Sequence, residues 1–370
     1  MDVDRDVNRS AGREGFEAGV IEGFYGRPWS WQQRQANIEF LGARGYRFYM
    51  YAPKADPYLR TRWREPYPEA MARDLAALAA WSRRHRVRFG IGLSPAGLHH
   101  DFGSEAKLTL ARKIEELEEL GIDEIALLFD DMRGDDPELA SKQVDIVHWA
   151  AGRLPGRRII MCPSYYSDDP VLDRVFGARP PGYLEQLGSS LDASVDVFWT
   201  GEEICAREIS VAHVRRVSER LQRKPLLWDN YPVNDGARMS QYLHLRAFTG
   251  RPAELRDHVV AHGINPALQP VLSRVPALTL LESYRLGSDY AYGAAFREAA
   301  VEVLGAELGQ RVYEDLLWLQ DVGLDRLGDK AEMLRARYQD SDHEGAREII
   351  AWLDGEYRIT DAIVRAQAGE

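Results

Sequence analysis

Short apolar runs alternate with longer amphipathic stretches over most of this 370-residue chain. Apolar runs of four to eight residues are typical of strands that are buried on both faces, whereas apolar residues at helical spacing indicate helices with one buried face. Ile125–Phe129 is an example of the first kind, and Glu69–Arg86, with Leu75, Leu78 and Trp81 on one face, is an example of the second. Seven further runs resemble strands and span residues 19–23, 46–51, 87–93, 158–161, 195–199, 225–228 and 258–261.

The alternation repeats at roughly thirty to forty residues, which is the rhythm of a parallel sheet with crossover helices. Eight such units over roughly 250 residues match a (β/α)8 barrel in number and in length. An open doubly wound sheet alternates in the same way, but it requires no particular number of strands, and the glycine-rich phosphate turn that often marks it is missing here. We therefore expect an α/β fold of the (β/α)8 TIM-barrel class.

The strand pattern is confined to the first three quarters of the chain. The first residues, 1–15, are polar and are predicted to be a disordered tail, and residues 16–291 are predicted to form the barrel. Residues 292–370 are predicted to form a C-terminal helical domain, with a hinge at Gly323–Gly328. Its helical patterns cover residues 296–304, 307–319, 329–337 and 344–363.

Two adjacent carboxylates, Asp130 and Asp131, follow the apolar run that ends at Phe129. In a parallel barrel the carboxyl ends of the strands form the active-site face, so these side chains are candidates for chemistry. Two carboxylates held this close cannot both ionise freely, and one pKa should rise, which suits a general acid. A helix N-cap pair or a solvated loop is an equally simple interpretation of the two residues alone.

Other expected strand ends carry the residue types of a sugar-binding site. Two glycines, Gly23 and Gly26, flank two aromatic residues and suit a close approach of the backbone to a ligand. Each candidate has a plainer interpretation when taken singly: a lysine is usually exposed, a tryptophan often belongs to the core, and an asparagine before a proline often makes a turn. Their joint placement at strand ends favours a site. The candidates are Lys54, Tyr166, Trp228, Asn230, Asp235 and Asn265.

Composition narrows the partners and the compartment. The net charge of −11 argues against nucleic acid or an anionic membrane as the main partner. The polar start has no signal-peptide core and no run is long enough to cross a bilayer, so we expect a cytoplasmic protein. Two cysteines, Cys162 and Cys205, are too few for a disulfide framework and are expected to be buried thiols. The nine histidines are scattered, which gives no metal-ligand pattern, and no nucleophile elbow is present.

Four segments carry a specific family resemblance. The segments Gly19–Trp29, Tyr51–Lys54, Leu127–Asp131 and Trp228–Asn230 closely resemble glycoside hydrolase family 84. This family holds O-GlcNAcases and related bacterial β-N-acetylglucosaminidases, and the resemblance covers about residues 18 to 290. It implies exo-acting, retaining hydrolysis of β-linked N-acetylglucosamine (GlcNAc) through an oxazoline intermediate, in which the 2-acetamido group of the substrate is the nucleophile. No metal or organic cofactor is implied.

The resemblance also implies a role for each matching residue. Asp130 corresponds to the carboxylate that orients the acetamido N–H, and Asp131 to the general acid and base. Tyr166, Trp228 and Asn230 correspond to the residues that hold the acetamido group. The positions that match contacts with the sugar hydroxyls are Asp235 for the 4- and 6-hydroxyls and Gly23, Lys54 and Asn265 for the ring hydroxyls.

Two departures from the family pattern leave the substrate open. Leu245–Ala247 stands where the family often has Gly-Pro, and Ser94–Gly97 carries an extra alanine. The implied partner is a GlcNAc-containing glycoside or a protein modified at Ser or Thr. The alternatives are the same chemistry restricted to small glycans or cell-wall fragments, and a catalytically silent barrel that binds GlcNAc. A homodimer through the helical domain is a further candidate assembly.

Overall fold

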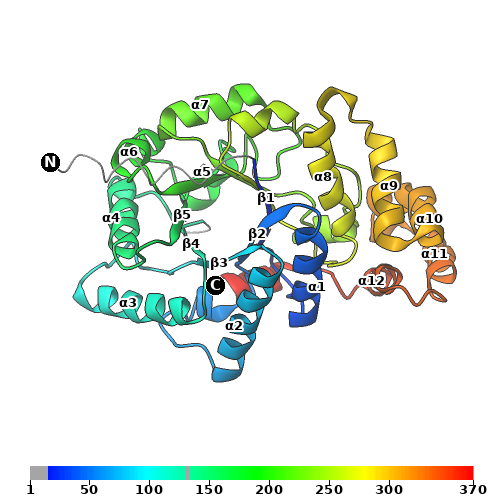
Figure 1. The fold of residues 1–370 in the computed structure, drawn as a ribbon, viewed down its shortest axis with the longest axis horizontal. Helices are drawn as coiled ribbons and strands as arrows, with labels where there is room; N and C mark the ends of the chain where they lie inside the picture. Colours follow the sequence, from blue (N-terminus) through cyan, green and yellow to red (C-terminus); the bar gives the residue numbers. More distant parts are fainter. Residues whose placement is uncertain (1–15, 131–132, 370) are drawn as a thin grey trace.

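Eight parallel strands, paired in sequence order, close into a barrel in the computed structural model (Figure 1), which describes residues 16–130 and 133–369. The predicted barrel is confirmed, and seven of the eight strands lie within one residue of their predicted positions. The strands are β1 (Ala18–Glu22), β2 (Tyr46–Tyr51), β3 (Arg88–Leu93), β4 (Glu124–Leu128), β5 (Arg158–Cys162), β6 (Asp196–Trp199), β7 (Leu226–Asp229) and β8 (His262–Ile264).

The eighth strand was predicted at residues 258–261, and this prediction is wrong. The strand begins only at His262, because Val260 and Ala261 each make a single backbone hydrogen bond to the strand-seven segment. A Cβ atom at Gly263 would lie 2.4 Å from Cδ1 of Ile21, so β8 runs where only a glycine fits. Strand propensity favours Val-Val over a segment centred on glycine, and the pattern therefore placed the strand too early.

Helices surround the barrel as the alternation predicted, with one exception. Between β7 and β8 two 3₁₀ turns, η2 (Met239–Gln241) and η3 (Ala253–Asp257), take the place of an α-helix. Leu75 and Leu78 are buried as predicted, whereas Trp81 is only partly buried. The helices are α1 (Trp31–Gly42), α2 (Glu69–Arg84), α3 (Ser104–Glu119), α4 (Leu139–Ala151), α5 (Val171–Phe176), α6 (Tyr183–Ser190), α7 (Val211–Leu221) and α8 (Arg274–Leu286).

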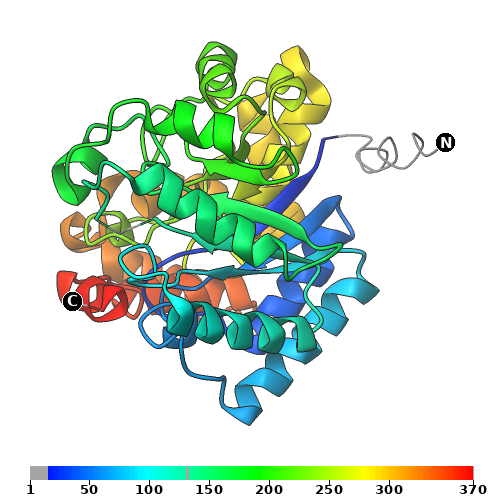
Figure 2. The same cartoon turned by 90° about the vertical axis from the view of Figure 1, so that its left-hand side faces the viewer.

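The C-terminal residues are helical and pack beside the barrel at α8 (Figure 1). The chain then returns, and α13 lies at the opposite end of the barrel from the start of β1 (Figure 2). The single helix predicted over residues 344–363 is wrong, because Gly355 has a positive φ of 77° that ends the helix and Thr360 caps a new one. The elements are α9 (Tyr292–Leu304), α10 (Ala306–Leu316), the π-helical η5 (Leu317–Val322), η6 (Leu324–Arg326), α11 (Lys330–Tyr338), α12 (Glu344–Leu353) and α13 (Asp361–Ala368).

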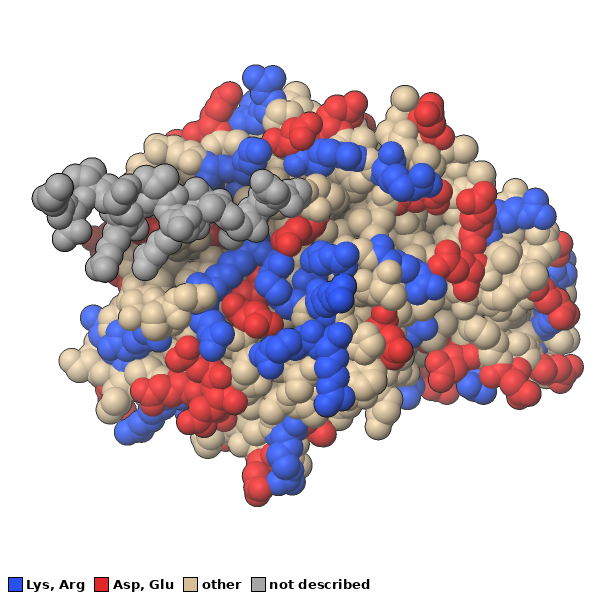
Figure 3. Space-filling model, in the orientation of Figure 1, with Lys and Arg blue, Asp and Glu red and all other residues tan. Residues whose placement is uncertain are grey.

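The outer surface mixes charges of both signs. On the face shown in Figure 3, Lys and Arg side chains gather near the middle, and acidic side chains lie directly beside them. Among the described residues, no helix is long and apolar enough to cross a membrane.

A buried ion pair anchors α1 to the barrel. Glu22, at the end of β1, receives hydrogen bonds from Nε and Nη2 of Arg34 on α1 at 2.8 and 2.7 Å, and a third from the hydroxyl of Tyr49 at 2.5 Å. Burial alone would lower the pKa of the Arg34 guanidinium, but the Glu22 carboxylate outweighs this effect and raises that pKa. The arginine also lies over the rings of Trp31 and Tyr51, at 4.6 and 4.9 Å from their centroids.

We expect Arg34→Ala to lower the free energy of unfolding by about 3–5 kcal/mol, because it leaves the Glu22 carboxylate buried without its charged partner. Chemical denaturation followed by circular dichroism would measure the loss. The matched control is Arg73→Ala on α2, whose partner Glu69 is also solvent-exposed, and it should cost less than about 0.5 kcal/mol. Equal losses in the two variants would contradict the anchoring role of Arg34.

Candidate active site

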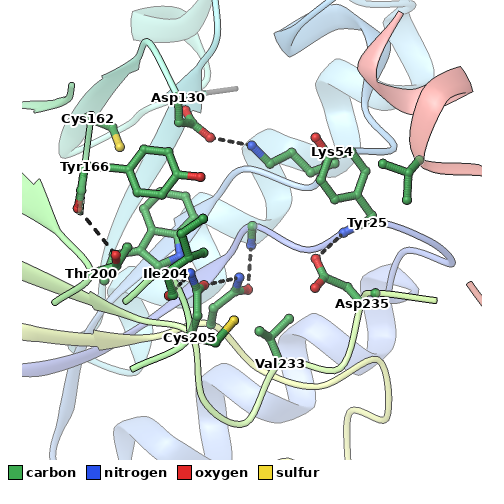
Figure 4. A pocket seen from close by; sticks show the side chains of 16 residues that line it. Tyr25, Lys54, Asp130, Cys162, Tyr166, Thr200, Ile204, Cys205, Val233 and Asp235 are labelled. Carbon is green, nitrogen blue, oxygen red and sulfur yellow. Dashed lines mark hydrogen bonds and ion pairs between the residues drawn. The ribbon is translucent and has the colours of Figure 1, made fainter. Parts of the chain in front are cut away.

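A cavity of about 280 Å³ opens at the C-terminal ends of the strands (Figure 4). All eight predicted site residues that the structure describes line it, although they come from six different strand ends or loops. They are Gly23, Lys54, Asp130, Tyr166, Trp228, Asn230, Asp235 and Asn265. The ninth, Asp131, lies outside the described residues, so its predicted role and the predicted rise of one pKa in the pair remain predictions.

Asp130 and Lys54 form a buried ion pair at the edge of this cavity. The Lys54 Nζ atom lies 2.5 Å from Oδ2 of Asp130, and Figure 4 shows the two side chains pointing toward each other. The pairing offsets the cost of removing both charges from water. The other oxygen, Oδ1 of Asp130, is buried and accepts no hydrogen bond from the described residues. Lys54 is therefore not the exposed lysine of the plainer interpretation, and Asp130 keeps an acceptor for a ligand.

Backbone hydrogen bonds past the strand ends place these two side chains. The N–H of Phe129 donates to the carbonyl of Cys162 at 2.9 Å, which extends the pairing of β4 with β5 to the residue before Asp130. The N–H of Lys54 donates to the carbonyl of Phe24 at 3.1 Å, which ties the Lys54 turn to the end of β1. Both side chains are thus held by the barrel itself.

Gly23 is required by the indole of Trp228. A Cβ atom at Gly23 would lie 2.2 Å from Cζ2 of Trp228, which is far inside van der Waals contact. The indole also packs edge-on against Phe198, with ring centroids 5.1 Å apart. The glycine therefore admits the indole, and because Gly23 itself lines the cavity, its expected close approach to a ligand stays a prediction.

Asn265 links three strand ends. Its Oδ1 accepts the N–H of Gly23 at 3.2 Å, and its Nδ2 donates to Oδ1 of Asn230 at 3.0 Å. Asn230 in turn donates through Nδ2 to the carbonyl of Ile204 at 2.9 Å. An amide nitrogen carries two N–H groups, so each of these asparagines retains one for a ligand. Asn265 is buried and does more than make a turn.

Asp235 reaches the cavity from the loop after β7. Its Oδ2 accepts the backbone N–H of Tyr25 at 2.9 Å, which joins this loop to the loop after β1 (Figure 4). The neighbouring Asn234 fixes the loop, since its amide bonds the carbonyl of Tyr242, Oε1 of Gln269 and the N–H of Leu268, each at 3.0 Å. The carboxylate of Asp235 is partly exposed and faces the cavity.

Between Trp228 and Asn230, Asp229 points away from the cavity into a buried charge cluster. Arg251 donates to both of its oxygens, at 2.7 and 2.8 Å, and Nε2 of His262 lies 2.9 Å from Oδ2. Burial would raise the pKa of Asp229, but the charge of Arg251 and the hydrogen bonds from Arg251 and His262 outweigh it and lower the pKa to about 2. This cluster fixes the strand end that carries two site residues.

Several lining residues were not predicted. Thr200 follows β6 directly and donates its N–H to the carbonyl of Tyr166 at 3.0 Å, so the strand-end rule could have found it. Val364 on α13 lies far from any strand end, and no sequence signal points to it. Cys162 is buried as expected, but Cys205 is exposed, because it lies in the loop after β6 and not in an apolar element. The remaining unpredicted lining residues are Tyr25, Ile204, Val233 and Gly236.

The lining combines a paired carboxylate, a second carboxylate, two amides and three aromatic side chains, which suits an uncharged ligand with hydroxyl and amide groups. Among residues 16–130 and 133–369, no three His, Cys, Asp or Glu side chains lie close enough together to hold a metal ion.

Comparisons with known proteins agree with this geometry. The sequence model of a β-N-acetylglucosaminidase family matches residues 18–320. The chain is 32% identical to the protein O-GlcNAcase of Mus musculus over 289 residues and 32% identical to that of Rattus norvegicus over 286 residues. Each alignment covers 75% of this chain but only 31% of the relative. The solved structure of an O-GlcNAc hydrolase mutant from Thermobaculum terrenum superposes with a TM-score of 0.78 at 31% identity, covering 96% of this chain and 84% of that one.

We expect the stability difference between the wild type and Asp229→Asn to depend on pH. The native pKa of about 2 lies below the unfolded value of about 3.9, so the contribution of the carboxylate is complete above about pH 5 and is lost as the pH falls toward 2. The difference should therefore shrink by about 1 kcal/mol between about pH 6 and about pH 3. Urea denaturation at a series of pH values measures it, with the exposed Asp289→Asn as the control. A difference that stays constant with pH would contradict the assigned pKa.

Proposed function

We propose that this chain is a glycoside hydrolase that removes terminal β-linked GlcNAc. The reason is that the chain belongs to the β-N-acetylglucosaminidase family. The proposed reaction retains the anomeric configuration and uses the substrate's own acetamido group as the nucleophile. Because the chain spans about a third of the length of its curated relatives, their full activity and substrates are part of the proposal.

The environment of Asp130 is the observation that carries this proposal. One carboxylate oxygen is held by Lys54 at 2.5 Å, and the other is a buried acceptor without a partner among the described residues. An acetamido N–H is a donor that would satisfy this oxygen, and the negative charge would stabilise the positive charge that develops on the amide as it attacks. Buried polar atoms are usually hydrogen-bonded, so an acceptor without a partner beside the cavity supports a ligand-binding role.

In the proposed first step, the acetamido carbonyl oxygen forms a bond to C1 while the bond from C1 to the leaving oxygen breaks. Asp131 gives its proton to the leaving oxygen, while the acetamido nitrogen keeps its proton and donates it in a hydrogen bond to Asp130. A protonated oxazoline, paired with the Asp130 carboxylate, therefore forms. In the second step, Asp131 takes a proton from water, the water oxygen attacks C1, and the ring opens to restore the acetamido group. Two inversions at C1 give net retention.

The remaining lining residues have matching roles in the proposal. Trp228 and Tyr166 enclose the acetamido group, and Asn230 donates to it. Asp235 binds the 4- and 6-hydroxyls, while the ring hydroxyls contact Gly23, Lys54 and Asn265. A cavity of about 280 Å³ is at the small end of ligand pockets, about 300–1,000 Å³, which supports the binding of one terminal sugar and thus exo action.

We include GlcNAc on Ser or Thr of proteins as the substrate in this proposal, since the curated relatives are protein O-GlcNAcases.

We also include a cytoplasmic location, because both cysteines are free thiols, as is usual in a reducing compartment. Recovery of the native protein mainly from the secreted fraction would contradict the location.

We expect Asp130→Asn to abolish most turnover of every substrate and Asp131→Asn to act selectively. Without its general acid, the enzyme should lose about 10²–10⁴-fold in kcat/KM on substrates with poor leaving groups, such as a GlcNAc-modified serine peptide or chitobiose, and far less on aryl glycosides whose leaving groups need no proton. Steady-state kinetics of the two variants, with a thiazoline that mimics the oxazoline as inhibitor, measures both effects.

The matched control is Asp135→Asn, an exposed carboxylate of the same loop that pairs with Arg133, and it should keep full activity. Equal losses of Asp131→Asn on good and poor leaving groups would rule out its acid role. Faster turnover of chitobiose than of the peptide would favour small glycans as substrates. A wild type that binds the thiazoline without turnover would be a silent GlcNAc-binding barrel, and one that does neither would overturn the proposal.

We expect Trp228→Ala to relax selectivity for the acyl group on the 2-amino nitrogen, because its indole forms the wall against the acetamido methyl. The ratio of kcat/KM for N-acetyl over N-butyryl aryl glucosaminides should fall by about tenfold or more. The control is Trp149→Ala on α4, a partly buried tryptophan that does not line the cavity. If the ratio were unchanged in Trp228→Ala, the assigned role would be incorrect.

A further inference from the structure

We propose that residues 356–367, here called the C-terminal clamp, hold together the two loops that grip the sugar, and that Gln367 and Val364 are positioning residues of the active site. The inference rests on the proposed function, because it assigns Asp235 to the sugar hydroxyls. The clamp lies beyond residue 320, where the match to the family model ends. Figure 4 shows the red ribbon of the C-terminal helix next to Tyr25 and Lys54.

The first attachment is to the loop after β1. The side-chain amide of Gln367 pairs with the backbone of Gly26 in both directions: the Gly26 N–H donates to Oε1 at 2.8 Å, and Nε2 donates to the Gly26 carbonyl at 3.0 Å. Gly26 has a positive φ of 102°, and a Cβ atom there would lie 2.3 Å from Cδ1 of Ile359. The loop therefore fits between two residues of the clamp, directly after Tyr25.

The second attachment is to the loop after β7. The N–H of Ile359 donates to Oγ of Ser240 at 3.1 Å in a buried contact. Ser240 in turn donates its own N–H to the carbonyl of Gly236 at 2.8 Å, and Gly236 directly follows Asp235. The clamp thus reaches the neighbour of each residue in the Tyr25–Asp235 contact.

These attachments converge on one hydrogen bond. The N–H of Tyr25 and Oδ2 of Asp235 are 2.9 Å apart, and this bond is one of the contacts that orient the carboxylate toward the cavity. The direction depends on how the two loops lie relative to each other, and the clamp bonds to both of them. Val364 adds the last part of the wall, because it lines the same cavity as the predicted sugar-binding residues.

A purely structural role for α13 agrees less well with its burial. None of the residues of α13 is buried, so the helix adds little apolar burial to the core. The outer ion pair of the clamp, between Arg27 and Glu356, is exposed on both sides and contributes little to stability. Before α13, the clamp also has an ion pair between Arg358 and Asp325 and the buried side chains of Tyr357 and Ile359. The hydrogen bonds of Gln367 go to Gly26 in the site loop, so their loss should affect substrate binding more than stability.

The test compares Gln367→Ala with Arg365→Ala, a matched control on the same helix. Within the part of the chain that the structure describes, the guanidinium of Arg365 bonds the carbonyl of Asp361 alone. We expect Gln367→Ala to raise KM for an aryl N-acetyl-β-glucosaminide by roughly threefold to tenfold, as for the loss of an ordinary hydrogen bond. The preference of this variant for the glucosaminide over the corresponding galactosaminide, which differs only in the configuration of the 4-hydroxyl, should fall by a similar factor. In Arg365→Ala, both KM and this preference should stay near the wild-type values. In Gln367→Ala, the midpoint of thermal denaturation should stay near that of the wild type.

Two further variants separate positioning from general loosening. Gln367→Glu keeps the acceptor for the Gly26 N–H but places a carboxylate oxygen against the Gly26 carbonyl, so it should raise KM at least as much as Gln367→Ala. In an Asp235→Ala background, Gln367→Ala should cause no further loss of selectivity at the 4-hydroxyl, because the carboxylate that it positions is gone.

Each outcome decides the proposal. If the wild type is active and Gln367→Ala has unchanged KM and selectivity, the clamp is overturned and the proposed function stays intact. The same conclusion follows if Gln367→Ala loses thermal stability but retains KM and selectivity. If the wild type binds the thiazoline without turnover, the same fold-change is expected in its Kd, and an unchanged Kd overturns the clamp. A wild type that neither turns over nor binds removes the proposed function and the clamp together.

Discussion

Burial of carboxylates at the C-terminal ends of the barrel strands is the constraint on which this structure depends. A charge removed from water must be paired and hydrogen-bonded, or the fold loses several kcal/mol, on the order of 3–5. The chain meets this constraint at three strand ends with the pairs Glu22–Arg34, Asp229–Arg251 and Asp130–Lys54. The first two carboxylates have both oxygens occupied, and they hold α1 and the end of β7 in place. Asp130 is the exception, because its Oδ1 has no partner among the described residues. The need to pair and hydrogen-bond a buried carboxylate therefore holds Asp130 in place through Lys54. It also marks Oδ1 of Asp130 as the atom to which a ligand would donate a hydrogen bond.

Much of the fold and most of the site could be predicted because both follow from a local rule. Apolar runs in the sequence indicate buried strands, and in a parallel barrel all these strands end on the same face. Polar residues that follow the strand ends therefore lie close together on that face. All eight described candidates that follow from this rule and the family resemblance line one cavity, and the rule could also have found Thr200. It failed where strand propensity and tertiary fit disagree: the strand at Gly263 depends on a close contact with Ile21, which no local pattern reports.

A glycine in a motif indicates a close approach without saying what approaches. Gly23 has no Cβ, and the space is taken by the indole of Trp228, a residue 205 positions later in the chain. The structure thus shows one approach to this glycine, that of the indole, and the approach of a ligand stays a prediction. For Lys54 the plainer interpretation, an exposed side chain, is wrong, because the lysine is buried and balances the carboxylate of Asp130.

The floor and the walls of the cavity differ in how their positions are determined. The floor residues Lys54 and Asp130 lie just past strand ends, where backbone hydrogen bonds to neighbouring strand ends and a buried ion pair hold them. The walls are loops, and a loop has only the contacts that other segments give it. The contact between Gly26 and Gln367 joins residues 341 positions apart. The entropy of closing so long a loop grows only with the logarithm of its length, and the folded barrel already brings these ends together. A single amide pair can therefore hold a wall of the cavity, although nothing in the local sequence at either end announces it.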